Sequence, residues 1–473
     1  MLSQGTIIAK ASGGGNAAIC LFRLSGSNAI PMVSRCFNAK SERKWKKQKS
    51  HTLHLGILHR DGAPIDEVLV SIFKNPNSYT GEDVVEISSH GSNFIQEEIL
   101  RLFIDQGAQP AKPGEFTLRA FLNQKMDLSQ AEAVADLIMS ETKAAHEVAL
   151  NQMRGGYTAE IGHLRQKLMD FASLITLELD FSEEDVAFAD RTDLRQLLED
   201  LKSKIKTLID SFQYGSVIKK GVPVAIVGKP NAGKSSLLNA MLNEERAIVS
   251  DIPGTTRDTI EDTLTLSGVQ FRFIDTAGLR ETQNQIEAVG VARAIEKIDT
   301  AKLLIFLYDP TDTNTDEIKQ SLNQFSRKDL SIVLVENKND LITKGKGKSL
   351  IPELEQLAIT IPYQKIFGIS TYDKQSIDQL KSILFDQVNQ LAVQGDVIVS
   401  NARHFEALQN ALKAILNVQN GMDEELSGDL LSVDINEALH YLGEISGAIT
   451  NDDCWGIYLV SFVLGSKYRF KFV

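Results

Sequence analysis

The pattern of apolar and polar positions changes several times along the chain. Residues 1–122 alternate short apolar runs with turns. Two of these runs have the length and composition of strands, and a helical pattern follows them. The predicted elements are strands over 68–73 and 84–88 and a helix over 93–106. This mixture predicts an α+β domain at the N-terminus.

Helical periodicity occupies 123–219 and returns near the C-terminus. Between the helical blocks, 220–385 alternates apolar strands with helices, which is typical of a parallel sheet in an α/β domain. The α/β block is therefore predicted to be inserted into one helical domain, whose second part is 386–473. The predicted helices cover 128–151, 157–180, 193–212, 402–418 and 433–449.

A phosphate-binding loop opens the α/β block. The residues from Gly228 to Ser235 read Gly-Lys-Pro-Asn-Ala-Gly-Lys-Ser, between a strand predicted over 221–227 and a helix predicted to begin at Ser236. Such a loop surrounds a phosphate with backbone N–H groups, and the helix N-terminus adds the positive end of its dipole. Lys234 is predicted to reach the β/γ oxygens in a catalytic role, and Ser235 is predicted to ligate Mg²⁺.

A second motif follows a strand that starts at Phe271. It reads Asp275-Thr-Ala-Gly278, and we expect Asp275 to hold Mg²⁺ through water and the Gly278 N–H to contact the γ-phosphate. Leu279 stands where many small GTPases have the glutamine that orients the attacking water. Glu287 is the predicted substitute, although it could also be a solvated helix residue.

Two further motifs select the base. The strand over 331–336 is followed by Asn337-Lys338-Asn339-Asp340. A carboxylate here accepts from N1–H and the exocyclic amine of guanine, which adenine cannot offer. Ser370 and Thr371 follow a strand over 364–369 and fit the loop that supports guanine O6. Ligands bind beyond the carboxyl ends of strands in open α/β sheets, so the four motifs together predict a GTPase.

The first switch is predicted over 250–258, where Thr256 would be the second Mg²⁺ ligand. No arginine finger is identifiable, so the site needs positive charge from elsewhere. We predict K⁺, bound by the Asn231 side chain and by oxygens of Ser250, Ile252 and Thr255, although Asn231 could instead cap its own turn. The predicted GTP-binding residues are Asn231, Ala232, Gly233, Lys234, Ser235, Ser236, Ser250, Asp251, Ile252, Pro253, Gly254, Thr255, Thr256, Asp275, Thr276, Ala277, Gly278, Asn337, Lys338, Asp340, Ser370 and Thr371.

Bulk composition agrees with a multidomain globular protein. The chain has 473 residues, of which 43% are hydrophobic and 24% charged. It has no apolar run of membrane-spanning length and no signal-peptide pattern, so we expect a cytoplasmic protein. Its 3 cysteines are too scattered for a disulfide framework or a zinc site. The net charge of −12 argues against a protein that coats nucleic acid unaided. The basic run 43–49 could touch phosphate or be a solvated loop.

Longer strings around these motifs resemble the MnmE (TrmE) family of tRNA-modification GTPases over nearly the whole chain. The resemblance does not depend on the general GTPase motifs, because several strings lie outside the α/β block. The matching strings are 23–26, 76–87, 113–125, 180–185, 251–258, 275–281, 401–407 and 441–447, together with Asn231.

The resemblance implies a tetrahydrofolate site in the N-terminal domain. Glu86 would pair with pterin donors, and Arg23 and Lys125 would meet carboxylates or a carbonyl. By residue type alone, these three and Arg119 are more simply surface ion pairs. The family also implies a homodimer formed through this domain, and an FAD-containing partner of the MnmG (GidA) type in a heterotetramer. The substrate would be tRNA, with a one-carbon folate helping to add a carboxymethylaminomethyl or aminomethyl group at C5 of the wobble uridine, position 34.

Two other functions stay open at this point. An Era-like GTPase of ribosome assembly would share the core but would need an RNA-binding appendage with clustered basic or aromatic residues. A folate-binding protein with a decayed GTPase is disfavoured by the intact Lys234, Ser235, Asp275 and Asp340.

The chain departs from the family after Asp453. The family ends in Phe-Cys-Ile-Gly-Lys, whose cysteine is required for modification, whereas this chain reads Cys-Trp-Gly-Ile-Tyr-Leu-Val-Ser-Phe-Val-Leu-Gly-Ser from Cys454. Loss of one nucleotide from a reading frame that encodes the family ending reproduces these residues. We therefore hypothesise a frameshift, and we do not assign Cys454 the role of the family's cysteine.

Overall fold

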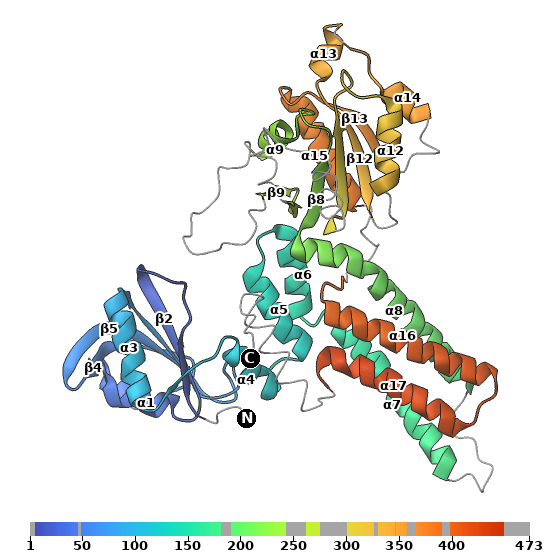
Figure 1. Cartoon of the computed structure of the whole chain (residues 1–473). Coiled ribbons are helices and arrows are strands. Elements are labelled where there is room, and N and C mark those ends of the chain that lie inside the picture. The colour runs from blue at the N-terminus through green and yellow to red at the C-terminus, as the bar shows by residue number, and fades with distance from the viewer. Residues whose placement is uncertain are drawn as a thin grey trace, which may run out of the picture. The chain divides into compact units, whose positions relative to one another are not determined.

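The computed structural model describes residues 5–45, 49–180, 191–242, 262–274, 300–325, 330–345, 347–356, 363, 365–389 and 398–448 (Figure 1). They belong to two compact units. The first comprises Met1–Ala135, Gln152–Thr158 and Gly443–Val473, and the second comprises Asp136–Asn151 and Ala159–Leu442. Each unit is built around its own sheet.

The sheet of the first unit has 7 strands in the order β3-β4-β5-β6-β2-β1-β7. Neighbouring strands are antiparallel, except that β1 and β7 are parallel. The strands predicted over 68–73 and 84–88 are confirmed as parts of longer ones. The bounds are β1 Ile7–Lys10, β2 Ala17–Ser25, β3 Phe37–Ala39, β4 Thr52–Arg60, β5 Ala63–Phe73, β6 Val84–Gly91 and β7 Gln109–Pro110.

Alternate residues of these strands bury one face of the sheet against helices. Phe22 and Leu24 of β2 and Val70 of β5 belong to this core, which also holds residues of helices α1 and α3. Helix α3 begins where Ser92 accepts a hydrogen bond from the Ile95 N–H, as an N-cap does. The helices are α1 Ala29–Cys36, α2 Glu42–Trp45, α3 Asn93–Asp105 and α4 Glu115–Leu122.

The single helix predicted over 128–151 is wrong, because the chain forms α5 (Leu128–Met139) and α6 (Lys143–Met153). Two hydroxyls interrupt it. Ser140 Oγ donates to Leu137 O at 2.7 Å and closes α5, and Thr142 Oγ1 accepts from the Ala145 N–H at 3.2 Å and caps α6. Such side-chain bonds compete with the helical pattern.

The sheet of the second unit has 6 strands in the order β13-β12-β11-β8-β10-β9. All neighbours are parallel except β9 and β10. This is the doubly wound sheet of a Ras-like P-loop domain, as predicted from the motifs. The bounds are β8 Val222–Val227, β9 Asp262–Leu266, β10 Val269–Phe273, β11 Leu303–Tyr308, β12 Ser331–Glu336 and β13 Lys365–Gly368.

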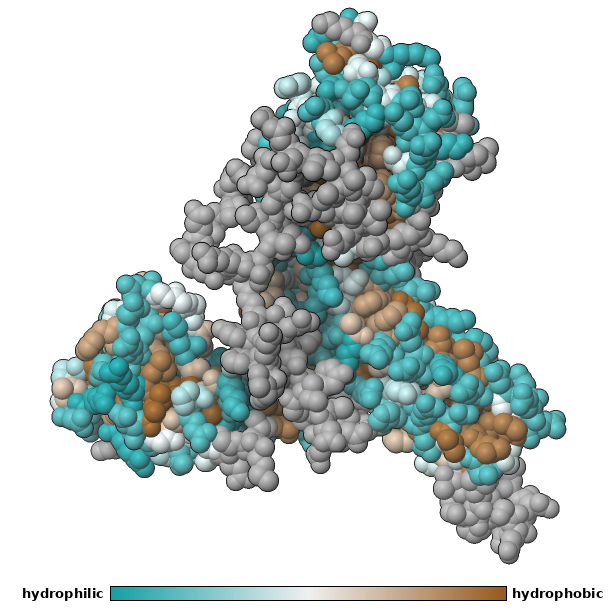
Figure 2. All heavy atoms as spheres, in the orientation of Figure 1, coloured by the Kyte–Doolittle hydropathy of each residue, from teal (hydrophilic) through white to brown (hydrophobic). Residues whose placement is uncertain are grey.

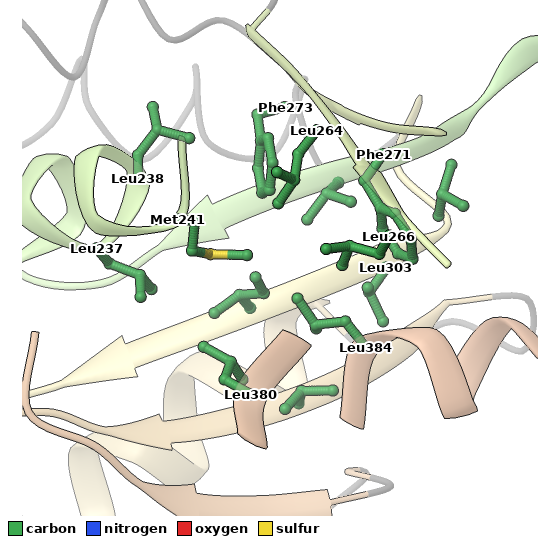
Figure 3. Packing of buried hydrophobic residues seen from close by; sticks show 14 of the residues in the cluster. Leu237, Leu238, Met241, Leu264, Leu266, Phe271, Phe273, Leu303, Leu380 and Leu384 are labelled. Carbon is green, nitrogen blue, oxygen red and sulfur yellow. The ribbon is translucent and has the colours of Figure 1, made fainter. Parts of the chain in front are cut away.

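Helices cover both faces of this sheet, so its central strands are apolar on both sides. On one face, Leu237 and Met241 of α9 and Leu380 of α15 pack against the strands (Figure 3). On the other face, Ile318 of α12 and Leu354 of α14 do so. The helices are α9 Lys234–Leu242, α12 Thr315–Phe325, α13 Asn339–Thr343, α14 Ile351–Gln356 and α15 Lys374–Asn389.

The α/β block is inserted between two helices that pack on each other. Helix α8 leads into β8, and α16 follows the block and lies beside α8 (Figure 1). Ser211 Oγ of α8 accepts from the Val399 N–H at 3.0 Å, and a Cβ on Gly215 would stand 2.2 Å from Val399 O. The long helices are α7 Thr158–Asp180, α8 Arg191–Lys220, α16 Ala402–Asp423 and α17 Gly428–Ser446.

Some apolar side chains of the helical part face solvent. Leu426, Leu430 and Val433 are 40%, 51% and 65% exposed, and Figure 2 shows apolar surface over this end of α16 and α17. Among the described residues, no helix is both long and apolar enough to cross a membrane.

Candidate functional site

The loop between β8 and α9 needs glycine at two positions. A Cβ on Gly228 would lie 2.0 Å from Leu307 O, so the loop leaves the sheet against the backbone of β11. Gly233 has φ +100°, and a Cβ there would lie 2.2 Å from Asn337 Nδ2. Helix α9 begins at Lys234 rather than at the predicted Ser236, because the Leu237 N–H already bonds Gly233 O at 2.8 Å. Ser235 and Ser236 therefore lie in its first turn.

The Lys234 ammonium closes the loop on itself. Lys234 Nζ donates to Gly228 O at 2.7 Å and to Lys229 O at 2.8 Å. The ammonium group therefore lies against the first two carbonyl groups of the loop. Asn231, in the same loop between Lys229 and Lys234, adopts a left-handed conformation with φ 64°.

Asn337 joins the phosphate loop, residues 228–235, to residues 337–340, which we call the base motif. Its Nδ2 donates to Ala232 O at 2.8 Å, and its backbone N–H donates to Tyr308 O at 2.8 Å. The side chain is buried, and its Oδ1 has no hydrogen-bond partner among the described residues. One buried amide thus fixes the end of β12 against the start of α9.

Lys338 pairs with a residue that the sequence did not single out. It has φ 60°, and its Nζ lies 2.6 Å from Asp309 Oδ2 at the end of β11. Burial alone would raise the pKa of the Asp309 carboxyl, but hydrogen bonds from Lys338 and Thr311 outweigh it and lower that pKa. The sequence offered one signal for Asp309, which is that an Asp-Pro pair stands directly after the apolar strand β11.

Asp340 is held by the last predicted loop. Ser370 Oγ donates to Asp340 Oδ1 at 2.9 Å, and Ser376 Oγ fixes Ser370 through its backbone N–H and carbonyl at 3.2 and 3.0 Å. Thr371 follows in the same turn. The structure therefore brings together the predicted phosphate loop, Asn337, Lys338, Asp340 and Ser370 at one edge of the sheet.

Other predicted residues of this site lie outside the described part of the chain. They are Ser250, Asp251, Ile252, Pro253, Gly254, Thr255, Thr256, Asp275, Thr276, Ala277, Gly278 and Glu287.

Arg23 and Glu86, predicted in the first unit, meet as cross-strand neighbours on β2 and β6. Arg23 Nη2 lies 2.7 Å from Glu86 Oε1, and the two side chains are 24% and 21% exposed. The guanidinium also lies 5.0 Å from the ring centre of Tyr79 and 5.6 Å from that of Phe116. The pair thus forms a partly exposed charged site, in which the Arg23 guanidinium lies near two aromatic rings.

Lys125 lies where residues 75–83 pack on α4. Its Nζ donates to Pro76 O at 3.0 Å, and Tyr79 Oη and Thr117 Oγ1 are 2.8 Å apart. Arg119 is not the surface residue its type suggested. It is buried with two carboxylates, Glu82 at 3.1 Å and Glu115 at 3.1 Å.

The end of α17 also lies in this unit, next to α4 and α5. A Cβ on Gly447, which has φ +75°, would be 2.9 Å from Leu128 Cβ and 3.1 Å from the Phe121 ring.

Comparison with known proteins covers both units. Residues 6–125 match a family model described as the GTP-binding protein TrmE N-terminus, and 128–457 match the MnmE helical domain. The tRNA modification GTPase MnmE of Flavobacterium johnsoniae is 49% identical over 98% of this chain and 100% of its own length. That of Bacteroides thetaiotaomicron is 48% identical over 95% and 97%. The FeoB G-domain of Methanococcus jannaschii aligns with 35% of this chain and 96% of its own at 24% identity and a TM-score of 0.25.

Proposed function

The chain belongs to the MnmE family of tRNA modification GTPases, and from this premise we propose that it reads guanine at the 337–340 motif and hydrolyses GTP at the β8–α9 loop. The family membership sets aside the Era-like and folate-only alternatives. The residue assignments within the site are our proposal.

The hydrogen bond from Asn337 Nδ2 to Ala232 O carries the proposal for the nucleotide site. This bond joins the segment that would bind phosphate to the segment that would read the base. The two segments therefore keep a fixed position relative to each other. Lys338 and Asp340 are each held from a neighbouring strand end, by Asp309 and Ser370. A carboxylate held in this way can meet both guanine donors at a fixed position.

The loop residues suit the two cations that we propose. Mg²⁺ and K⁺ take hard oxygen ligands, and the first turn of α9 offers the Ser235 hydroxyl while the left-handed turn at 231 places an asparagine in the loop. We propose Mg²⁺ at Ser235 and Thr256, and K⁺ at Asn231 with Ser250, Ile252 and Thr255. The ions would supply positive charge next to the phosphates.

We further propose that Arg23, Glu86 and Lys125 bind a tetrahydrofolate derivative. The partly exposed carboxylate of Glu86 pairs with Arg23, whose guanidinium lies near two aromatic rings, and this arrangement suits a flat heterocycle with hydrogen-bond donors. A bound folate would supply the one-carbon unit. In this proposal a cytoplasmic homodimer works with an FAD-containing MnmG-type partner on the tRNA wobble uridine, and its domains are 1–122, 123–219 with 386–473, and 220–385.

Deletion of the gene, followed by mass spectrometry of tRNA nucleosides, tests the cellular part. We expect C5-modified wobble uridine to disappear, to return with a gene copy whose reading frame encodes the family ending, and not to return when that copy carries Lys234→Ala. Unchanged modification in the deletion strain would overturn the proposed role. Titration of the purified protein with GDP and ADP tests the base, and equal affinities would overturn the guanine site.

A further inference from the structure

A carboxyl group is buried directly behind the base motif. Glu336, the last residue of β12, is 0% exposed. Its Oε2 accepts from Tyr308 Oη at 3.3 Å and from the Leu350 N–H at 2.8 Å, while its Oε1 is buried without a partner among the described residues. Burying a carboxyl group is unfavourable unless it is fully paired, so an apolar residue would serve the core better here.

Glu336 lies where the ends of three strands are tied together. On the β11 side, Tyr308 Oη bonds its carboxyl while Tyr308 O accepts from the Asn337 N–H. The next residue, Asp309, holds Lys338. The Glu336 carboxyl is thus linked to the base motif through the end of β11, which holds both Asn337 and Lys338.

The β13 side is tied to the same residue. The Ile369 N–H donates to Glu336 O at 2.7 Å, and the next residue, Ser370, holds Asp340. The Leu350 N–H, at the start of α14, brings the segment after α13 onto the carboxyl. Asp309 holds Lys338 and Ser370 holds Asp340, and each of these two residues is therefore next to a residue that bonds Glu336.

We propose that the Tyr308–Glu336 pair is a positioning device for guanine recognition, which sets Asp340 at the place where it meets the exocyclic amine of the base. The proposal rests on the proposed function of this site. It assigns the pair no contact with nucleotide and no part in hydrolysis. Burial raises the pKa of Tyr308, so its hydroxyl remains a donor.

The test compares GDP with IDP, which lacks the exocyclic amine. Glu336→Gln keeps the shape but replaces one acceptor oxygen with a donor, and Tyr308→Phe removes one hydroxyl. For Glu336→Gln we expect the preference for GDP over IDP to fall roughly tenfold, about the share of one hydrogen bond to a charged group. IDP, which keeps the N1–H donor, should lose less affinity than GDP, and kcat at saturating GTP should be unchanged. Tyr308→Phe should shift the preference in the same direction by less, because the Leu350 bond remains.

Tyr363→Phe is the matched control. Its hydroxyl donates to Leu354 O at 3.2 Å on the same face of the sheet, rather than to a residue of the base motif. It should leave the preference unchanged. An unchanged preference in Tyr308→Phe and Glu336→Gln, or an equal loss of GDP and IDP affinity, would overturn the positioning role. If Glu336→Gln does not fold, Tyr308→Phe alone decides. Wild-type protein that binds ADP as well as GDP would instead overturn the guanine site itself.

Discussion

Gly233→Ala should separate the phosphate loop from the base motif. The residue has φ +100°, and the added methyl group would stand 2.2 Å from Asn337 Nδ2. That amide nitrogen is the donor to Ala232 O. The substitution therefore strains the backbone and displaces the amide that joins the two motifs.

The magnitude follows from these two terms. A non-glycine residue held in this conformation costs about 1–3 kcal/mol. The lost hydrogen bond contributes about 1 kcal/mol. If the loop relaxes to escape both, nucleotide binding must restore its shape, which weakens binding by about 2–4 kcal/mol, or roughly 30- to 1000-fold in the dissociation constant.

Calorimetric titration with GDP measures the effect, and thermal unfolding of the same samples reports folding. Gly155→Ala is the matched control, because Gly155 has φ +101° with nothing within 4 Å of an added Cβ. It carries the same backbone strain in the other unit, so it should lower the melting temperature and leave GDP affinity unchanged. Wild-type GDP affinity in folded Gly233→Ala would refute the reasoning.

Four further predictions concern other parts of the chain. GTP hydrolysis should be fast in K⁺ and slow in Na⁺, and Asn231→Ala should abolish this difference while nucleotide binding persists; equal rates for wild type in both salts would contradict the cation site. Glu287→Ala should lower turnover far more than GTP affinity, and unchanged turnover would identify a solvated residue. The hydrogen bond to Asp66 raises the pKa of His90, so the ion pair stabilises the fold below the ordinary histidine pKa and its contribution is lost as pH rises through the raised value. An NMR titration should show this midpoint move down in Asp66→Asn, and no movement would exclude Asp66 as the cause. A chain made with 454–473 as printed should hydrolyse GTP without supporting tRNA modification, and finding that peptide by mass in cells with normal modification would exclude the frameshift.

The sequence predicted local structure around the proposed nucleotide site well. The strand 331–336 was confirmed to the residue, because a run of apolar residues between polar ones fixes a buried strand and both of its ends. Asn337, Lys338, Asp340 and Ser370 were found together at one sheet edge because parallel strands bring their carboxyl ends to the same side.

What was missed depends on contacts between distant residues. Asp309 and Lys338 are 29 positions apart, and Tyr308 and Glu336 are 28 apart, so only the pairing of β11 with β12 makes them neighbours. The break between α5 and α6 was missed for a different reason. Ser140 and Thr142 are both compatible with a helix. Whether one helix or two forms depends on which backbone groups their hydroxyls bond, and the sequence does not show this.

The insertion of the α/β block between α8 and α16 has a consequence for synthesis on the ribosome. Helix α8 emerges early, yet the helix that covers its leucines begins only at Ala402. The intervening block has its own sheet and core, so it can fold before α8 is covered. Once folded, it holds α8 close to the segment that leads into α16. A folded block with adjacent ends acts as a short tether, so closing the helical pair costs far less entropy than a free loop of that length would. Until then, the leucines of α8 that α16 covers stay exposed on the nascent chain, and exposed apolar surface of this kind promotes aggregation.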